Sequence, residues 1–456
     1  SLTVEGRGGS FTAPAGTLTI NSYAPSGDPI IFGIKSGGTY VHSSGNVEVT
    51  TAANSKWIYD IGTGNLNNLI INYSGNTNEL AAALTIDGNL TITAGTLTTS
   101  GSNLALTVTG KTTVAGTLTL NDSVVLLGTT STSDYGLEMT AGALDMGGAD
   151  VKTGAVNVSS GTVTMTSATW EVMSAYSSNA WIFVPSSLLP AAYTDRGTLK
   201  FTSPLGGNIR TPQGMNNVIF EPSSGTPTWT VVTQSFGCVN LNMVGDTYAG
   251  TLDTNDFGLS VTSTLEVDGT ASILECGDSA LTLGQDDTDS GWGLYNTGGT
   301  INGGTGDWTV SSFYHHTGVT TLTDGTITMN GKDTGGAVIQ YLGYGTLTHP
   351  TNGIIDIADE GGFINITGAN LTLYELRVNS SSTHNIVATS TSNTLTLTTL
   401  KITDGGINTL HPSKTDAALT VTGTTTVNGG TLTCNASTIR LGESVTGSAY
   451  GLGVSS

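Results

Sequence analysis

The stretch that decides the fold is LTVTGKTTVAGTLTL at residues 106–120, in which apolar residues alternate with threonine in three short runs. Alternation with a period of two is typical of a β-strand that buries one of its faces. Gly110 and Gly116 separate the runs, and glycine adopts the positive φ values that sharp corners often need. The stretch therefore predicts three short strands joined by tight corners.

The preceding segment, LTIDGNLTITAGTLTTSGSN at residues 84–103, has the same organisation. Leu106 follows Leu84 by 22 residues, and Leu118 follows Leu97 by 21 residues. Three strands that return after about 22 residues predict one coil of a right-handed parallel β-helix, a β-solenoid, so the expected fold class is all-β. A flat antiparallel meander is the competing arrangement, but it requires hairpin turns and longer strands.

A longer repeat contains this short one. The motif returns as LSVTSTLEVDGTASIL at 259–274 and as LTVTGTTTVNGGTLT at 419–433, and a Gly-Leu pair ends at Leu137, Leu294 and Leu452. The spacing predicts units of about 155 residues with about seven coils each, and about 20 coils in the chain. The expected divisions are residues 1–134 as a first, partial superunit, 135–291 as the second, 292–450 as the third, and 451–456 as the start of a further unit.

Charge and composition limit the classes of partner. The chain contains 34 acidic and 13 basic residues, a net charge of −21, and 63 of its 456 residues are glycine. A surface this acidic disfavours nucleic acid and anionic membranes, and no apolar run is long enough to cross a bilayer. The chain begins with serine and shows no signal peptide, so we expect a processed chain or part of a longer one.

The three cysteines lack the spacing of a metal site or a disulfide framework. Aligning the three copies places Cys276 and Cys434 where the first copy has Leu120. A leucine at the same position predicts buried free thiols. The other side chains expected to point into the coil are those of the opening stretch: Leu106, Val108, Val114 and Leu118.

The most acidic segment, GQDDTDSGWG, contains Asp286, Asp287 and Asp289 before a glycine. Asp-x-Asp spacing followed by glycine resembles the start of a calcium loop, whose ligands are oxygen atoms. A solvated acidic corner is the alternative, because the equivalent loops contain only Asp134 and Glu443. We expect no other cofactor.

Three further groups of residues have chemical potential. Asp253 and Asp256 come closest to a catalytic carboxylate pair, with turn formation as the alternative. His315 and His316 are adjacent on an expected strand and so point to opposite faces, which makes them a poor chelate; both are expected at corners or on the surface. Five tryptophans either pack or line a glycan-binding groove: Trp170, Trp181, Trp229, Trp292 and Trp308.

GKTTVAGTLTL and GTTTVNGGTLT resemble the Gly-Gly-Thr-Thr-Val-x-x-Gly-Thr-Leu repeat of autotransporter passenger domains and related bacterial surface β-helix adhesins. The resemblance implies an extracellular, non-catalytic structural or adhesive protein at the cell surface. Its partners would be copies of itself in a homo-oligomer or polymer, or a glycan or cell-surface receptor. A virion fibre or capsid-decorating protein is the alternative. A polysaccharide-processing β-helix enzyme is a third hypothesis, and it predicts acids and an arginine gathered on one face over adjacent coils.

Overall fold

The computed structural model describes fourteen stretches of the chain: residues 2–4, 8–21, 30–50, 56–129, 133–183, 197–210, 215–245, 247–284, 291–358, 361–388, 393–408, 415–433, 438–442 and 452–455. These residues form strands and turns and contain no helix. The chain divides into two compact units, Ser1–Ile219 (unit 1) and Phe220–Ser456 (unit 2). The superunit boundaries expected from the sequence are not tested by this division and stay predictions.

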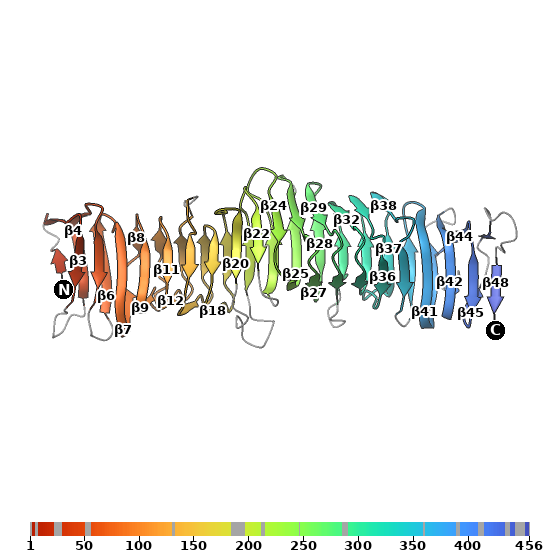
Figure 1. The fold of residues 1–456 in the computed structure, drawn as a ribbon, viewed down its shortest axis with the longest axis horizontal. Helices are drawn as coiled ribbons and strands as arrows, with labels where there is room; N and C mark the ends of the chain where they lie inside the picture. Colours follow the sequence, from red (N-terminus) through yellow and green to blue (C-terminus); the bar gives the residue numbers. More distant parts are fainter. Residues whose placement is uncertain are drawn as a thin grey trace. The chain divides into compact units, whose positions relative to one another are not determined.

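Each unit is a β-solenoid whose neighbouring strands run parallel (Figure 1). The prediction of an all-β parallel coil is therefore confirmed. About 15 turns with a spacing of about 23 residues are seen, slightly fewer turns than the 20 expected. The one antiparallel strand pair in the described residues joins β41 (Leu371–Ala388) to the two-residue β43 (Thr415–Asp416).

Unit 1 contains three parallel ladders. Ladder 1 consists of β8 (Leu84–Ile86), β10 (Leu106–Val108), β13 (Val124–Leu127), β16 (Asp150–Thr153), β19 (Thr169–Val172) and β21 (Thr198–Phe201). Ladder 2 consists of β3 (Thr17–Ile20), β5 (Asn46–Val49), β7 (Asn68–Leu80), β9 (Leu90–Thr98), β11 (Thr112–Val114), β14 (Leu137–Met139), β17 (Val156–Val158), β20 (Asn179–Phe183) and β22 (Gly207–Arg210). Ladder 3 continues the ends of β7 and β9 through β12 (Thr117–Thr119), β15 (Ala143–Asp145) and β18 (Thr162–Thr164).

The remaining strands of unit 1 surround β4 (Ile30–Val41), which pairs with β1 (Leu2–Val4), β2 (Ser10–Thr12) and β6 (Lys56–Thr63). The division between the units falls inside β23 (Met215–Phe220).

Unit 2 also contains three main ladders. Ladder 4 consists of the start of β25 (Phe236–Val244), β27 (Leu259–Val261), β30 (Leu281–Leu283), β33 (Trp308–Val310), β36 (Thr326–Met329), β39 (Ile354–Ile357), the middle of β41, β42 (Thr394–Asn408), β45 (Thr425–Asn428) and β48 (Leu452–Ser455). Ladder 5 consists of the end of β25, β28 (Leu265–Asp268), β31 (Leu294–Asn296), β34 (Phe313–His315), β37 (Ala337–Tyr341), β40 (Gly362–Ile366) and the end of β41. Ladder 6 contains β24 (Thr228–Val231), β26 (Gly250–Asp253), β29 (Ser272–Glu275), β32 (Thr300–Asn302), β35 (Val319–Thr321) and β38 (Thr346–Thr348).

Near the end of unit 2, β42 also pairs with β44 (Ala418–Val421) and β46 (Thr431–Thr433), and β44 pairs with β47 (Ile439–Leu441).

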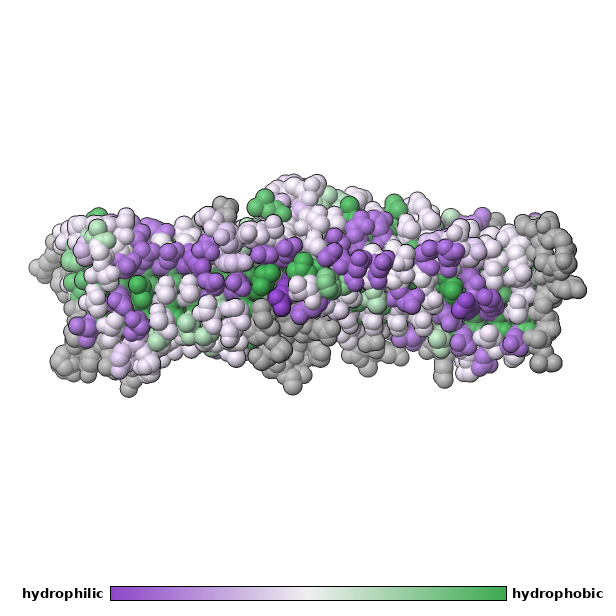
Figure 2. Space-filling view, viewed as in Figure 1, coloured by the Kyte–Doolittle hydropathy of each residue, from purple (hydrophilic) through white to green (hydrophobic). Residues whose placement is uncertain are grey.

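The core of each unit is a column of apolar side chains, one above another along the ladders. All five residues that the opening stretch places inside are completely buried, as predicted: Leu106, Val108, Val114, Leu118 and Leu120. Thr107, Thr113 and Thr119 are half-buried on the outer face, whereas Thr112 at the start of β11 points inward and is completely buried. The outer face in Figure 2 is accordingly hydrophilic or neutral over most of its area, with apolar side chains in scattered spots.

Asparagines link successive coils at one corner of unit 1. The Asn68 side chain donates to Asn46 at 2.9 Å and accepts the amide of Asn89 at 2.7 Å; the Asn89 side chain accepts the amide of Lys111 at 2.8 Å. The coils are so close here that a Cβ atom added to Gly110 would lie 2.6 Å from the Gly88 carbonyl oxygen. Gly110 is thus required for close approach between coils, rather than for the positive φ that we expected.

Coil length is less uniform than the sequence indicated. In ladder 1 the inward residues that pair in succession are Leu84, Leu106, Val125, Val151, Trp170 and Leu199. Their spacings run from 19 residues, between Leu106 and Val125, to 29 residues, between Trp170 and Leu199. The strands keep their register, and the loops between them take up the difference.

Corresponding positions of the long repeat have matching environments in the first two copies. The Thr99 hydroxyl donates to the carbonyl oxygen of Leu120 at 2.7 Å, and the Thr254 hydroxyl donates to that of Cys276 at 2.8 Å. Cys276 is completely buried, as predicted for a residue that replaces Leu120. Cys238 is also buried and free, and Cys434 lies outside the described residues.

The third copy shifts in phase. Leu259 and Leu419 begin equivalent motifs, yet Leu259 belongs to ladder 4, whereas Leu419 pairs with Leu395, which pairs with Leu371. Ladder 4 passes through β41 and β42 at different residues, Leu376 and Leu400. The interval between these two motifs is therefore close to the expected seven coils but is not a whole number of coils, because coil lengths vary.

Candidate functional site

The predicted calcium ligands Asp286, Asp287 and Asp289 lie outside the described residues, which stop at residue 284 and resume at 291. Glu443, in the third copy of that loop, also lies outside them. The calcium hypothesis therefore stays a prediction. Across the described ranges, no group of three or more His, Cys, Asp or Glu side chains is arranged to hold a metal ion.

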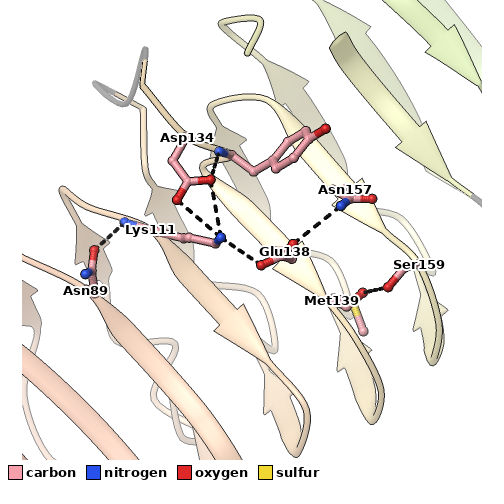
Figure 3. A network of polar contacts seen from close by, with 8 residues as sticks. Asn89, Lys111, Asp134, Glu138, Met139, Asn157 and Ser159 are labelled. Atoms are coloured by element: carbon pink, nitrogen blue, oxygen red, sulfur yellow. Dashed lines mark hydrogen bonds and ion pairs between the residues drawn. The ribbon is translucent and has the colours of Figure 1, made fainter. Parts of the chain in front are cut away.

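Asp134, the acid in the first copy of the same loop, is among the described residues and belongs to an ion-pair network (Figure 3). Lys111 Nζ lies 3.2 Å from the Asp134 carboxylate and 2.7 Å from Glu138 Oε2. Burial lowers the pKa of Lys111, but hydrogen bonds to Glu138 and Asp134 outweigh this and raise it overall. In the first copy a lysine thus neutralises the acids at this corner.

Asp253 and Asp256 form turns. Asp253 Oδ1 accepts the amide of Asn255 at 2.8 Å, and Asp256 Oδ1 accepts the amide of Asp278, one coil away, at 2.8 Å. Asn255 and Asp256 have φ values of 49° and 62°, in the left-handed region that Asn and Asp tolerate. Each carboxylate is committed to a backbone amide, which supports the turn-forming alternative for this pair.

The adjacent histidines do point to opposite faces. His316 is half-buried on the outer face, but His315 is completely buried, so the expectation of a surface or corner position was wrong for His315. The alternation along β34 turns Phe313 and His315 inward together, and the His315 ring lies 5.6 Å from that of Tyr341. Burial lowers the pKa of His315 to about 4, which keeps the imidazole neutral at pH 7.

Four of the five clustered tryptophans are core residues, as the packing alternative predicted: Trp170, Trp181, Trp229 and Trp308. The Trp170 and Trp181 rings, for example, meet edge to face at 4.6 Å. The exception is Trp292, which is half-buried and contacts the ring of Tyr314 at a centroid distance of 5.2 Å.

Trp292 belongs to a group of five partly exposed aromatic side chains on unit 2, which we call the aromatic strip: Trp292, Tyr295, Tyr314, His316 and Tyr344. Tyr295 on β31 and Tyr314 on β34 occupy paired positions on neighbouring strands, with ring centroids 4.7 Å apart. His316 follows at 6.1 Å from Tyr314, and Tyr344 at 5.6 Å from His316. Tyr344 is 68% exposed.

Polar side chains extend the aromatic strip along the outer face of ladder 5. Glu266 pairs with Tyr295 on one side, and Gln340 pairs with Tyr314 on the other. Burial, and then the neighbouring Asp268, raise the pKa of Glu266. The pKa of Tyr295 is also raised, first by burial and then by Glu266 and Asp268. One end of the strip is thus acidic, and the other presents a neutral amide.

A second cluster lies on the outer face of ladder 4, where Asp356, Arg377 and Lys401 occupy paired positions on β39, β41 and β42. We call these three residues and Glu375 the ionic cluster. Glu375 Oε1 accepts hydrogen bonds from Lys401 Nζ at 2.9 Å and from Arg377 Nε at 2.5 Å. Burial raises the pKa of Glu375, but these two hydrogen bonds outweigh it and lower the pKa overall, whereas burial raises the pKa of Asp356.

Sequence reasoning missed both clusters. In the ionic cluster, Arg377 follows Asp356 by 21 residues and Lys401 follows Arg377 by 24, each about one coil. A search for charged residues one coil apart is the signal that would have found them. Of the tyrosines and tryptophan in the aromatic strip, only Trp292 was among the residues considered for a glycan-binding groove. Tyr314 and Tyr344 are separated from it by coils of unequal length, so no fixed spacing connects them.

A serine and a histidine also meet inside unit 2. Ser380 Oγ lies 2.8 Å from His384 Nε2, the distance of a nucleophile from its base. Ser380 is 4% exposed and His384 is completely buried. A substrate cannot reach a pair enclosed in the core, so we interpret it as a polar contact between two inward side chains.

No helix among the described residues is long and apolar enough to span a bilayer. Comparison of the chain with protein-family models, with curated proteins and with solved structures finds no match. The stacked coils of the structure themselves show that the chain is a tandem-repeat β-solenoid.

Proposed function

We propose that this chain is a non-catalytic extracellular protein with a structural or adhesive role, and that it builds a rigid rod, fibre or surface layer. The observation that carries the proposal is the stacking of equivalent inward residues in both units, such as Leu106 on Val125 in ladder 1 and Leu281 on Trp308 in ladder 4. A solenoid of this kind grows along one axis, because each coil contacts only its neighbours.

The mechanism is mechanical. Backbone hydrogen bonds run between coils, so bending the solenoid stretches many of them at once. The outer face presents half-buried threonines such as Thr107, Thr113 and Thr119, which offer neither strong charge nor reactive groups. The net charge of −21 keeps such repetitive β-structure soluble.

The resemblance of GKTTVAGTLTL to bacterial surface β-helix adhesins supports a location at the cell surface. The partners we propose are copies of this chain in a homo-oligomer or polymer, and a glycan or receptor bound by the coils that differ between copies.

Electron microscopy of the purified chain over a range of concentrations tests assembly. We expect filaments or a lattice for the wild type and for Thr113→Asp, whose side chain points outward. Val114→Asp should abolish the filaments or lattice, because Val114, the residue after Thr113, is completely buried and the substitution places a charge in the core. Isolated particles at every concentration would overturn the assembly that we propose.

A virion fibre or capsid-decorating protein is the alternative, and the same stacked coils support it equally well. Adjacent genes that encode capsid or tail proteins would favour it over a cell-surface protein.

One observation favours a polysaccharide-processing enzyme as a second candidate. That hypothesis predicts acids and an arginine on one face over adjacent coils, and the ionic cluster has this composition. Asp356, whose pKa is raised, would be the proton donor, and Arg377 would stabilise negative charge. If the chain cleaves a polysaccharide, Asp356→Asn should abolish cleavage and Asp253→Asn should leave it intact. Unchanged cleavage in Asp356→Asn would exclude this site.

A further inference from the structure

We propose that the aromatic strip of unit 2 binds an uncharged oligosaccharide. The proposal rests on the adhesive role proposed above and names the class of ligand. Its site is the outer face of β31 and β34, together with residues 291–293 before β31 and residues 342–345 after β37.

The fold itself does not require aromatic residues at these positions. Alignment on Leu137 and Leu294 makes Glu138 the first-copy counterpart of Tyr295, and alignment on the next rung makes Asn157 the counterpart of Tyr314. In the first copy the same rungs hold the Lys111 network and a hydrogen bond between Asn157 and Glu138 (Figure 3). The inward positions before these residues stay apolar, Leu137 and Val156 in the first copy and Leu294 and Phe313 in the second. The inward positions after them change from Met139 and Val158 to the buried Asn296 and His315.

The rings are placed to meet a ligand. Tyr295 and Tyr314 are tilted by 58° and Trp292 and Tyr314 by 47°, so none of these pairs closes into a parallel stack that would cover both faces. Each ring is partly exposed, and Tyr344 is mostly exposed. Grouped exposed aromatic side chains on a soluble protein mark binding surfaces. The apolar C–H faces of pyranose rings pack against aromatic rings, while the ring edges carry hydroxyl groups.

The spacing suits a chain of sugars. Rungs of a β-ladder are about 4.8 Å apart, and successive centroids along the aromatic strip are 4.7–6.1 Å apart. These distances are close to the length of one pyranose unit in an extended oligosaccharide. Successive sugars can therefore lie over successive rings.

The polar side chains at the two ends supply directional contacts. Glu266 and Asp268 accept hydrogen bonds from sugar hydroxyls at the acidic end, and Gln340 donates and accepts at the other. The same carboxylates repel phosphates and uronic acids. Stacking platforms for single-stranded nucleic acid combine aromatic rings with a basic groove, whereas Tyr295 is flanked by acids. The combination selects an uncharged glycan.

A glycan array bearing neutral and acidic oligosaccharides tests the proposal on the full chain. We expect retention of neutral members, and then a quench or shift of tryptophan fluorescence when the best neutral oligosaccharide is titrated in solution. Tyr314→Ala should weaken its affinity at least tenfold. The double variant Tyr295→Gln/Tyr314→Asn removes both rings without adding a charge beside Glu266, and it should also lose binding while keeping the thermal midpoint of the wild type.

Tyr248→Ala is the matched control, because Tyr248 is a 41% exposed tyrosine of unit 2 outside the aromatic strip. Its affinity should equal that of the wild type. The inference is overturned if the array retains no neutral glycan, if acidic glycans alone are retained, or if Tyr248→Ala and Tyr314→Ala weaken binding equally. Filaments without glycan binding would refute this site and leave the structural role standing. Glycan binding by isolated particles would support this site and overturn the proposed assembly.

Discussion

The backbone amide of Tyr374 donates a hydrogen bond of 2.8 Å to Nδ1 of His349, one coil earlier. An imidazole that accepts at Nδ1 carries its proton on Nε2 and is neutral. Burial lowers the pKa of His349 to about 4, although Asp324 opposes the effect. His315, buried beside Tyr341, has a pKa lowered to about 4 by burial as well.

We therefore expect the free energy of unfolding to fall as pH drops from about 6.5 to about 4. The unfolded chain takes up protons on both histidines in this window, and the folded chain does not, so lower pH favours unfolding. For His315 the loss by pH 4 is about 3 kcal/mol. Urea denaturation at several pH values measures it.

His315→Phe and His349→Asn remove the titrating groups, and the asparagine keeps an oxygen that can accept the Tyr374 amide. Combining the two substitutions should flatten the dependence on pH between 6.5 and 4. An unchanged slope would show that these histidines do not account for it.

Cys276 should tolerate leucine. Burial first, and then the charge of Glu275, raise the pKa of its thiol, so a thiol reagent should label it only after unfolding. The first copy holds Leu120 in the same environment, so Cys276→Leu should change the free energy of unfolding by less than about 1.5 kcal/mol. Cys276→Asp, which buries a charge, should cost well over that. Comparable losses in both variants would contradict the equivalence of the two copies.

Glu375 should stabilise unit 2 through Arg377 and Lys401. We expect Glu375→Gln to cost about 1.5–3 kcal/mol at pH 7, the usual range for hydrogen bonds to a charged group. Because the folded-state pKa of Glu375 is lowered, its contribution is complete above the ordinary pKa of 4.5 and disappears as pH falls through the folded value. The wild type and the variant should converge in acid.

A double-mutant cycle with Lys401→Gln isolates the pair from the rest of the ionic cluster. Additive losses would mean that Glu375 and Lys401 do not stabilise each other.

The column of core residues should be sensitive along its whole length. Leu118 stacks between Leu97 and Leu144, and its truncation to alanine should cost about 2–5 kcal/mol by creating a cavity. Thr119→Ala, one residue away on the outer face, should cost less than about 0.5 kcal/mol. Denaturant midpoints compare the two, and equal losses would contradict the assignment of inner and outer faces.

Much of the fold was predictable from residues 106–120. Alternation along each run separated Val114 from Thr113 correctly, because successive side chains on a strand point to opposite faces. The match between Leu120 and Cys276 predicted a buried thiol, which the complete burial of Cys276 confirms. The hydrogen bonds of Thr99 and Thr254 to the carbonyl oxygens of Leu120 and Cys276 show that the two positions are equivalent. His315 was misjudged because its polarity was weighed above the alternation that places it beside Phe313.

The sequence by itself determined that strands coil in parallel and which face of each strand is inside. The parallel coil follows from three short strands that return after about 22 residues, and the inward face follows from the period of two along each strand. Tertiary structure alone decided which residues become neighbours on the outer surface. Coil lengths range from 19 to 29 residues along ladder 1, so a fixed offset does not connect one rung to the next. That Tyr295 meets Tyr314 therefore becomes clear only once the hydrogen-bond register of the coils is known.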